Sequence, residues 1–272
     1  HPQAVPMEAL LDLEPDAVLS VGGQWINKKP KQHLRALGIK KHVHIDIFQC
    51  WDVLDAEVLH LRMAPNALAV YKSAPEFIRI PSVEPVSKPL PWSDAAAFQS
   101  VVSKLNTTDV LHLGNSSIVR YFNYFPKAVQ LYGNRGVAGI DGSLSTAVGA
   151  ALADPDRKHF LIIGDQSFLY DHNGLYGQKI PQNLVVCVLN NGVGGIFDWL
   201  PGTASTGPTA QRVFANAQNV NLEGIASAFG VDYESVSSVA ALVAALDTAE
   251  GAKIIDSKTE QRANLAALAA LR

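Results

Sequence analysis

The chain has few cysteines, little net charge and no long apolar run, and each shortage excludes a class of protein. Its two cysteines, Cys50 and Cys187, lie far apart in the sequence, so we expect free thiols in a reducing, cytoplasmic compartment. A net charge of −3 offers no basic surface for nucleic acid. No apolar run reaches the roughly 18 residues that cross a bilayer, so we expect no membrane span.

The sequence also lacks an initiating methionine and a recognisable signal peptide. It begins at His1, so we expect a fragment or a processed chain. Its 272 residues, 48% of them apolar and 17% charged, are enough for one large or two modest globular domains with a sizeable core.

What the chain does have is a regular alternation of apolar runs and helix-like segments. Residues 17–23 and 42–48 predict two strands around a basic helix at about 28–37, which is the β-α-β unit of a parallel sheet. Four prolines between residues 81 and 91 predict a linker at about 74–94. A longer alternation follows and predicts an α/β domain with a doubly wound parallel sheet. Its expected strands are 110–114, 129–132, 160–164, 184–190, 231–233 and 253–256, its expected helices are 115–124, 142–152, 165–178, 222–229, 239–249 and 261–271, and a loop is expected around 202–208.

Two short polar motifs follow neighbouring strands of this predicted sheet. Gly164-Asp165-Gln166-Ser167 comes after one apolar run, and Asn190-Asn191-Gly192 ends the next, 25 residues after Asp165. Ligands of open α/β sheets bind at the carboxyl ends of strands, and a carboxylate, an amide and the carbonyls of a glycine turn suit Mg²⁺ held together with phosphate oxygens. Each motif alone is also an ordinary turn or helix cap. The prediction of a Mg²⁺-diphosphate anchor therefore depends on the pairing of the two.

Two arginines near the preceding strand ends indicate recognition of carboxylates. Ser116 follows one predicted strand with Arg120 one helical turn later, and Arg135 lies in the glycine-spaced loop after the next strand. Two guanidinium groups at neighbouring strand ends can clamp carboxylates, whereas a solvated arginine and a flexible connector are the plain alternatives. The same loop holds Ile140, which could wedge under a bent cofactor, and the glycines after Asn191 offer backbone groups to a diphosphate.

Four motifs occur in order and carry a family resemblance: Gly-Asn-Ser-x-x-x-Arg from Gly114, Asn-Arg-Gly-x-x-Gly-Ile-Asp-Gly from Asn134, Gly-Asp-x-Ser-x-x-Tyr-Asp-x-Asn from Gly164 and Asn-Asn-x-x-Gly-x-Ile-Phe-x-x-Leu-Pro from Asn190. Together they resemble the 2-succinyl-5-enolpyruvyl-6-hydroxy-3-cyclohexene-1-carboxylate synthases, the thiamine diphosphate (ThDP)-dependent carboligases of menaquinone biosynthesis. The Gly-Asp and Asn-Asn pairs also match the general ThDP signature, although Gln166 stands where that signature has glycine. The resemblance implies that residues 1–90 are part of a central α/β domain ending in the linker, and that 91–272 are the diphosphate-binding domain.

The resemblance implies a role for each motif residue. Asp165 and Asn191 would ligate Mg²⁺ or Mn²⁺ through their side chains, and Val193 through its carbonyl. The other implied roles are diphosphate binding by Gly164, Gln166, Ser167 and Gly194, support of the bent cofactor by Ile140, an apolar lining of the cofactor and substrate pocket by Ile196, Phe197 and Leu200, and substrate binding by Ser116, Arg120, Arg135 and Lys28. For Lys28, which would reach in from the central domain, the alternative is an ordinary exposed lysine.

The implied reaction decarboxylates 2-oxoglutarate on ThDP and adds the resulting carbanion to isochorismate. The protein would bind and orient the substrates while the cofactor takes up the electrons. In the family, a glutamate that promotes ylid formation lies on a pyrimidine-binding domain, which precedes the central domain and is supplied by a second subunit. This chain has no room for that domain. We therefore expect a homo-oligomeric parent enzyme, half an active site in this chain, no activity of the chain alone, and exposed apolar surface at Ile196, Phe197 and Leu200.

Two other functions stay open at this point: another ThDP-dependent decarboxylase or carboligase, and a module that binds cofactor without catalysis. The arginines argue against the first, because a keto acid with no second carboxylate needs no such clamp. His42 and His44, with Cys50, lack the spacing of a zinc site, so we expect both histidines on a solvated strand face. Asp171 has either a role in folding or a contact with the cofactor.

Overall fold

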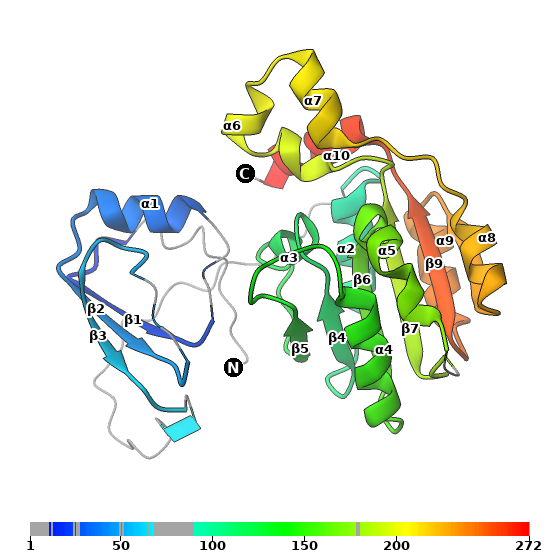
Figure 1. Ribbon diagram of the computed structural model, residues 1–272, viewed down its shortest axis with the longest axis horizontal. Helices are drawn as coiled ribbons and strands as arrows, with labels where there is room; N and C mark the ends of the chain where they lie inside the picture. Colours follow the sequence, from blue (N-terminus) through cyan, green and yellow to red (C-terminus); the bar gives the residue numbers. More distant parts are fainter. Residues whose placement is uncertain are drawn as a thin grey trace. The chain divides into compact units, whose positions relative to one another are not determined.

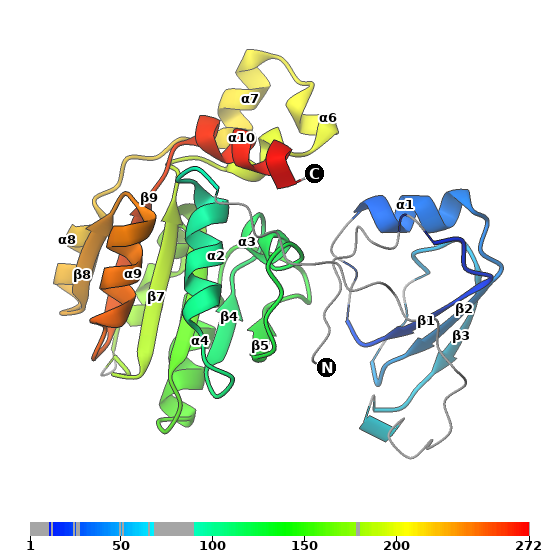
Figure 2. The same cartoon turned by 180° about the vertical axis from the view of Figure 1, so that it is seen from behind.

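The structure is a computed structural model (Figures 1 and 2), and it describes residues 11, 13–23, 25, 28–48, 50, 52–64, 66–67, 90–177 and 180–271. The chain divides into two compact units, one of Gln3–Glu84 and one of Pro85–Arg272 with His1–Pro2. Most of the predicted linker, residues 74–89, lies outside the described residues. The two units are described separately below.

The smaller unit contains a three-stranded parallel sheet. Its elements are β1 (Ala17–Val21), α1 (Lys28–Ala36), β2 (Lys41–Ile45) and β3 (Glu57–Leu61). The strand order is β1-β2-β3, so the predicted β-α-β unit is confirmed and β3 is an addition to it. Leu34 of α1 packs with Ile39 and Leu54 in a small buried cluster, which holds the helix against the sheet.

The two histidines of β2 are buried, so the prediction of a solvated strand face was wrong. His42 is 2% exposed and His44 is 7% exposed. The hydroxyl oxygen of Ser20 on β1 lies 2.7 Å from Nε2 of His42 and 2.7 Å from Nδ1 of His44. Both rings therefore lie on a buried face of β2, and burial lowers the pKa of His42.

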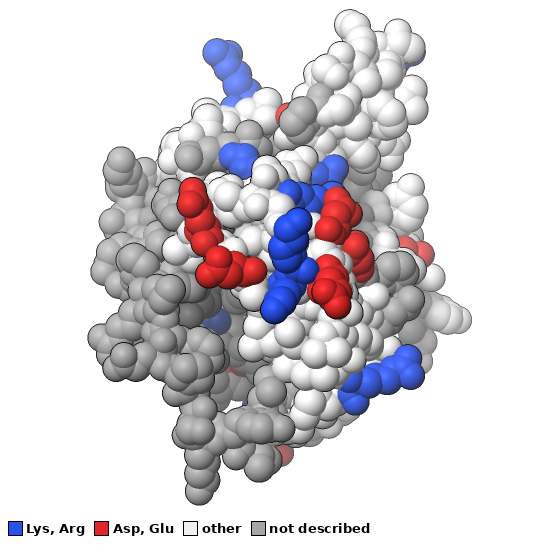
Figure 3. Space-filling model, turned by 90° about the vertical axis from the view of Figure 1, so that its left-hand side faces the viewer, with Lys and Arg blue, Asp and Glu red and all other residues white. Residues whose placement is uncertain are grey.

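Charged side chains on the face drawn in Figure 3 are interspersed rather than gathered by sign. Arg35 and Asp55 illustrate this mixing in the smaller unit, where their side chains lie 3.5 Å apart. Exposed pairs of this kind contribute at most about 1 kcal/mol to stability. In the part of the chain that the structure describes, no helix combines the length and the apolar character needed to cross a membrane.

The larger unit is built on a six-stranded parallel sheet. Its strands are β4 (Val110–Leu113), β5 (Gln130–Gly133), β6 (His159–Gly164), β7 (Leu184–Asn190), β8 (Asp232–Val236) and β9 (Lys253–Lys258). Their order is β5-β4-β6-β7-β9-β8, and every pair of neighbours is parallel. Parallel strands that are covered on both faces read as continuous apolar runs, which is why β6 and β7 were recognisable in the sequence. The predicted α/β fold class is confirmed.

Helices cover both faces of this sheet. The helices around the sheet are α2 (Asp94–Lys104), α3 (Ile118–Tyr121), α4 (Ser143–Ala153), α5 (Asp165–Asp171), α8 (Leu222–Ala228) and α9 (Val239–Asp247), and α10 (Gln261–Leu271) lies beyond one end of the strands. Figure 1 shows α4 and α5 in front of the sheet, and Figure 2 shows α2 and α9 on the opposite face. On the first face, Leu161 and Ile163 of β6 pack with Leu144 of α4 and Phe168 of α5. This core fixes the helices whose first turns reach the candidate site.

The structure differs from the predicted elements in several regions. The helix α2 and the strand β3 were not predicted, and the helix expected over 115–124 is reduced to α3 (Ile118–Tyr121). The helix expected over 165–178 ends at Asp171 and is followed by a 3₁₀ turn, η3 (His172–Leu175). The loop expected around 202–208 contains α6 (Pro201–Ala204) and begins α7 (Pro208–Ala215). Both α6 and α7 begin with proline. In glycine-rich sequence, proline predicts a loop, but proline is also favoured in the first turn of a helix.

The strand order places a topological switch point between β4 and β6. The chain moves from β4 to β5 on one side, whereas β6 and the later strands lie on the other side of β4. Ligands of open α/β sheets bind at the carboxyl ends of the strands beside such a point. The loops after Leu113 and Gly164 leave the sheet at this edge, and the loop after Asn190 leaves it from the next strand.

Candidate active site

Asp165 is a buried carboxylate at the carboxyl end of β6. Its side chain is at the start of α5 and the residue is only 3% exposed. Nε2 of Gln218 donates a hydrogen bond of 2.6 Å to Oδ2 of Asp165, and the backbone N–H groups of Gln166 and Gly192 also reach the carboxylate. Burial, with a smaller contribution from the neighbouring carboxylate of Asp94, raises the pKa of Asp165 to about 6. A carboxylate surrounded by amides and a second carboxylate is suited to binding a cation.

Asn191 follows β7, the strand paired with β6, so the two polar motifs meet at one edge. Its Nδ2 donates to Oδ2 of Asp94 over 2.9 Å, and its Oδ1 accepts a hydrogen bond of 3.0 Å from the backbone N–H of Val193. Asp94 belongs to the first turn of α2 and is 2% exposed. Its other oxygen accepts a hydrogen bond of 2.5 Å from the hydroxyl of Thr259. We call Asp94, Asp165, Asn191 and Gln218 the edge cluster.

The loop after Asn191 needs glycine at several positions. Gly192 has a φ of 72°, a conformation that residues with a side chain rarely adopt. A Cβ on Gly194 would lie 3.1 Å from the carbonyl oxygen of Phe214, and a Cβ on Gly195 would lie 3.0 Å from Nδ2 of Asn191. The backbone therefore approaches its neighbours as closely as glycine allows. The N–H of Gly194 donates to the carbonyl of Ala215 over 2.6 Å, and the carbonyl of Gly192 accepts from the N–H of Gln218 over 2.9 Å.

The first turn of α5 is tied to two other loops. Nε2 of Gln166 donates to the carbonyl of Ala215 over 3.0 Å, and the hydroxyl of Ser167 donates to the carbonyl of Ile140 over 2.5 Å. The side chain that replaces the glycine of the ThDP signature thus connects α5 to the last residue of α7. Gly164, the last residue of β6, is half-buried directly before this turn.

Arg120 and Arg135 lie close enough for their charges to interact. Desolvation and the charge of Arg135 lower the pKa of Arg120, and desolvation lowers the pKa of Arg135. The guanidinium of Arg120 donates to the carbonyl of Ser116, and that of Arg135 donates to the amide oxygen of Asn115. Among the described residues, Nε of Arg135 is buried without a hydrogen-bond partner. Both guanidinium groups are partly buried and donate to neutral acceptors in these bonds, an arrangement that suits an anion.

The apolar residues after the glycine loop are less exposed than expected from the sequence. Ile196 is 9% exposed, and Phe197 and Leu200 are half-buried. Phe197 stacks on Phe214 of α7, with ring centroids 5.5 Å apart. The helix α7, which was not predicted, therefore covers part of Phe197.

Two other predicted residues have plain surroundings. Lys28 belongs to the smaller unit, where it is the exposed first residue of α1. Asp171 is buried and accepts hydrogen bonds from the backbone N–H of Ser145 at 2.8 Å and from its hydroxyl at 3.1 Å. It therefore holds the first turn of α4 to the end of α5, which favours the role in folding over contact with a cofactor.

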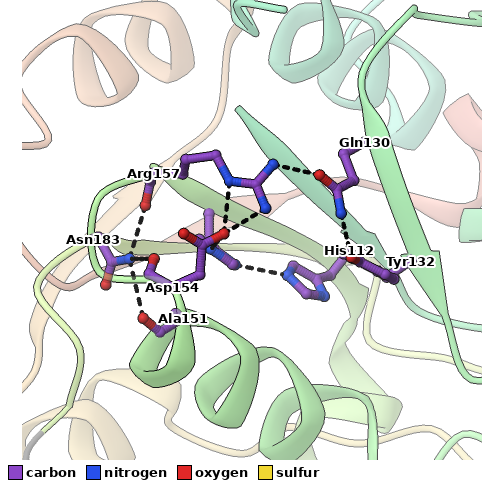
Figure 4. Close-up of polar contacts among 8 residues, drawn as sticks. His112, Gln130, Tyr132, Ala151, Asp154, Arg157 and Asn183 are labelled. Carbon is purple, nitrogen blue, oxygen red and sulfur yellow. Dashed lines mark hydrogen bonds and ion pairs between the residues drawn. The ribbon is translucent and has the colours of Figure 1, made fainter. Parts of the chain in front are cut away.

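A second polar cluster lies beside the amino end of β6 (Figure 4). Nε2 of His112 lies 3.0 Å from Nδ1 of His159, and Arg157 binds the carboxylate of Asp154 through its Nε at 2.6 Å. Arg157 also donates to the side chain of Gln130. Burial is the main cause that lowers the pKa of His112 to about 4. We call His112, Asp154, Arg157 and His159 the His112 cluster; its members contribute to the wall of a pocket of about 400 Å³.

Two residues of the edge cluster were not predicted from the sequence. Asp94 is 97 residues from Asn191, and Gln218 is 53 residues from Asp165. Ser93, whose hydroxyl caps α2 by accepting from the N–H of Ala96, was a local signal for that helix. No local sequence pattern indicates that Asp94, the residue after Ser93, contacts the loop of Asn191.

The edge cluster fits a divalent cation and a diphosphate. Among the described residues, no three His, Cys, Asp or Glu side chains gather into a metal-binding group. A cation here would therefore depend on Asp165, the amide oxygen of Asn191, the carbonyl of Val193 and oxygens of a bound phosphate. This all-oxygen set with few protein ligands is the one that Mg²⁺ prefers, and the buried carboxylates supply charge that a cation would balance.

Comparisons with known proteins identify a family for most of the larger unit. Residues 113–257 match the family model "Thiamine pyrophosphate enzyme, C-terminal TPP binding domain". The chain is 31% identical to the 2-succinyl-5-enolpyruvyl-6-hydroxy-3-cyclohexene-1-carboxylate synthase of Flavobacterium psychrophilum over 82% of this chain and 43% of the relative. It is 34% identical to the synthase of Christiangramia forsetii over 83% of this chain and 42% of the relative. The chain thus spans less than half the length of these relatives.

A solved structure shares the fold. A protein described as a thiamin diphosphate-dependent enzyme from Mycobacterium smegmatis aligns with a TM-score of 0.63 and 20% identity, over 90% of this chain and 49% of that protein. At this identity the match shows the fold alone. The family model, which matches more than half of the chain, shows that the chain belongs to the thiamine pyrophosphate enzymes, and the curated relatives to which it is similar are 2-succinyl-5-enolpyruvyl-6-hydroxy-3-cyclohexene-1-carboxylate synthases.

Proposed function

We propose that the chain carries the ThDP- and Mg²⁺-binding part of a carboligase that decarboxylates 2-oxoglutarate and adds the four-carbon product to isochorismate. In this proposal residues 91–272 are the diphosphate-binding domain and residues 1–90 are part of a central domain. Asp165 and Asn191, with the Val193 carbonyl, hold Mg²⁺ or Mn²⁺. When bound, ThDP supplies the electron sink for decarboxylation.

The observation that carries the proposal is the charge pattern of one sheet edge. Buried carboxylates gather at the ends of β6 and β7, and two partly buried guanidinium groups gather at the ends of β4 and β5. The first group suits a cation and the second suits anions. Both proposed substrates carry more than one carboxylate, which Arg120 and Arg135 would bind and orient with charged hydrogen bonds.

The test is cofactor binding and substrate choice in the complete protein. Isothermal titration calorimetry should show that ThDP binds with Mg²⁺ and much more weakly after the metal is removed with EDTA. The protein should then release CO₂ from 2-oxoglutarate and consume isochorismate. Binding of ThDP with turnover of pyruvate instead would support another ThDP-dependent decarboxylase, and binding without any turnover would support a cofactor-binding module.

We also propose that the 272 residues alone do not complete the reaction. The chain spans 42–43% of the length of the two relatives described above. In the proposal, the rest of the active site, including the pyrimidine-binding domain of a second subunit, comes from other sequence. Assay of the isolated chain with ThDP, Mg²⁺ and both substrates should give no turnover, and a rate of roughly 1 per second or more would contradict this part of the proposal.

A further inference from the structure

We propose that Asp94 is a positioning residue that decides which end of the Asn191 amide faces the metal. The inference rests on the proposed function, in which Asn191 is a metal ligand. It concerns a side chain on α2, on the face of the sheet opposite α4 and α5, and no sequence motif assigned a role to it.

An asparagine ligand has an orientation problem that an aspartate ligand does not have. Only the oxygen of the amide can bind a cation, because the NH₂ end is a donor without a free lone pair. Two neighbours of Asn191 agree on one orientation. The carboxylate of Asp94 requires a donor and lies 2.9 Å from Nδ2, and the backbone N–H of Val193 requires an acceptor and lies 3.0 Å from Oδ1. In the flipped amide, the oxygen would face the carboxylate of Asp94, and the NH₂ group would face the N–H of Val193.

Oδ1 of Asn191 keeps a capacity for a metal in this orientation. An amide oxygen has two lone pairs, and the N–H of Val193 uses one of them. Gly195 makes room for the other end of the amide, since a Cβ at that position would lie 3.0 Å from Nδ2. The oxygen end is thus available and the nitrogen end is enclosed.

Asp94 is itself held from two directions. Its second carboxylate oxygen accepts a hydrogen bond of 2.5 Å from Thr259, and its backbone N–H donates to Oδ1 of Asn264 over 2.7 Å. Thr259 directly follows β9, and its own N–H donates to the carbonyl of Asn190 over 3.0 Å. The acceptor that faces Asn191 is therefore fixed by α2, β9 and α10 together. Outer partners that orient metal ligands in this way typically change metal affinity by about 10–100-fold when they are removed.

The first experiment measures Mn²⁺ affinity by electron paramagnetic resonance in the complete protein at saturating ThDP. Asp94→Ala should weaken Mn²⁺ binding by about 10–100-fold. Asp94→Asn keeps one acceptor for Asn191 and should retain most of the affinity. The matched control is Asp109→Ala, because Asp109 is also a buried carboxylate that accepts a backbone N–H, from Asn106 at 2.7 Å, in the loop after α2. It should lower the melting temperature and leave the Mn²⁺ affinity unchanged.

The second experiment exchanges the two side chains and separates positioning from folding. Asn191→Asp alone brings a second carboxylate against Asp94 and should weaken Mn²⁺ binding, although it adds a negative charge to a cation site. In the double variant Asp94→Asn, Asn191→Asp, the amide introduced at position 94 can donate to the carboxylate introduced at position 191, whose two oxygens are equivalent. This exchange should recover Mn²⁺ affinity relative to Asn191→Asp.

The outcomes separate this inference from the proposed function. If the wild-type protein binds no Mn²⁺ in the presence of ThDP, the proposed function fails and the inference fails with it. A different result overturns only the inference. If the wild type binds Mn²⁺, but Asn191→Asp lowers the Mn²⁺ affinity by the same factor in the wild-type protein and in the Asp94→Asn variant, then Asp94 does not position Asn191. Melting temperatures of the metal-free variants show whether each protein is folded during the measurement.

Discussion

Two polar clusters lie beside the same six-stranded sheet, and they handle charge in opposite ways. In the His112 cluster, the carboxylate of Asp154 is paired with the guanidinium of Arg157, and Nδ1 of His159 lies 3.0 Å from Nε2 of His112. In the edge cluster, the groups that act on the Asp165 carboxylate are amides and another carboxylate, Asp94. The first cluster contains its own counter-charge and the second does not.

This difference teaches where a ligand is needed. A buried carboxylate without a counter-charge destabilises the folded protein unless a cation binds to it. The edge cluster is therefore destabilising in the absence of a ligand. The His112 cluster is anchored within the fold, and Asn183 beside it donates to the carbonyls of Ala151, Asp154 and Arg157 at 2.8–3.2 Å. Variants in the two clusters should therefore affect different quantities, namely cofactor binding at the edge and stability at the His112 cluster.

The largest effect is expected from Asp165→Ala. Removing a proposed metal ligand should weaken Mg²⁺-dependent ThDP binding by more than the roughly 10–100-fold that follows loss of an outer partner. Because burial raises the pKa of Asp165 to about 6, its removal should not destabilise the metal-free protein at pH 8. Calorimetry and urea unfolding measure the two quantities. Asp154→Ala is the control, and unchanged ThDP affinity in Asp165→Ala would contradict the metal assignment.

The next prediction concerns acid stability and the His112 cluster. The pKa of His112 is lowered from 6.5 to about 4, so between these values the unfolded chain binds more protons than the folded one. The stabilising contribution is fully present above pH 6.5 and is lost as the pH falls towards 4, by about 3 kcal/mol at 1.36 kcal/mol per pKa unit. Urea unfolding from pH 7.5 to 4.5 should show this loss of stability. In His112→Gln, the part of the loss that comes from protonation of His112 should be absent. If the free energy of unfolding falls equally steeply with pH in the variant, other groups cause the acid sensitivity.

Arg120→Ala and Arg135→Ala should change substrate use and leave cofactor binding intact. Loss of one charged hydrogen bond to a substrate carboxylate costs about 1.5–3 kcal/mol, so kcat/KM for the complete enzyme should fall roughly tenfold or more in each variant. Steady-state kinetics with 2-oxoglutarate and isochorismate test this. Arg157→Ala removes a guanidinium from the His112 cluster and should leave kcat/KM unchanged. If ThDP affinity fell in the Arg120 or Arg135 variant, that arginine would belong to the cofactor site.

The smallest effect is expected from Asn183→Ala. Its amide nitrogen donates to three carbonyls that join the end of α4 to the loop before β6. Loss of these bonds should lower the free energy of unfolding by about 1–3 kcal/mol, because buried acceptors lose their donor. ThDP affinity in the complete protein should stay the same. A clear loss of ThDP binding would mean that the two clusters are coupled through α4, and the contrast between them would fail.

Local patterns were sufficient to predict most of the larger unit. The apolar runs that became β6 and β7 are continuous because helices cover both faces of a parallel sheet. The helices α6 and α7 were missed because they are short and begin with proline in glycine-rich sequence. The burial of His42 and His44 was missed because period-2 alternation shows that two residues share a face and does not show whether that face is covered.

The sequence by itself determined the chemistry at the ends of the strands. Asp165 and Asn191 directly follow apolar runs, and parallel strands of one sheet end at the same edge, so their proximity followed from local pattern and a general rule of topology. Only the tertiary structure decided which side chains support them. The contacts of Asp94 with Asn191 and of Gln218 with Asp165 join segments 97 and 53 residues apart. Such contacts depend on how helices and loops pack around the sheet, and hydrophobic periodicity carries no information on which distant polar group will complete a buried hydrogen bond.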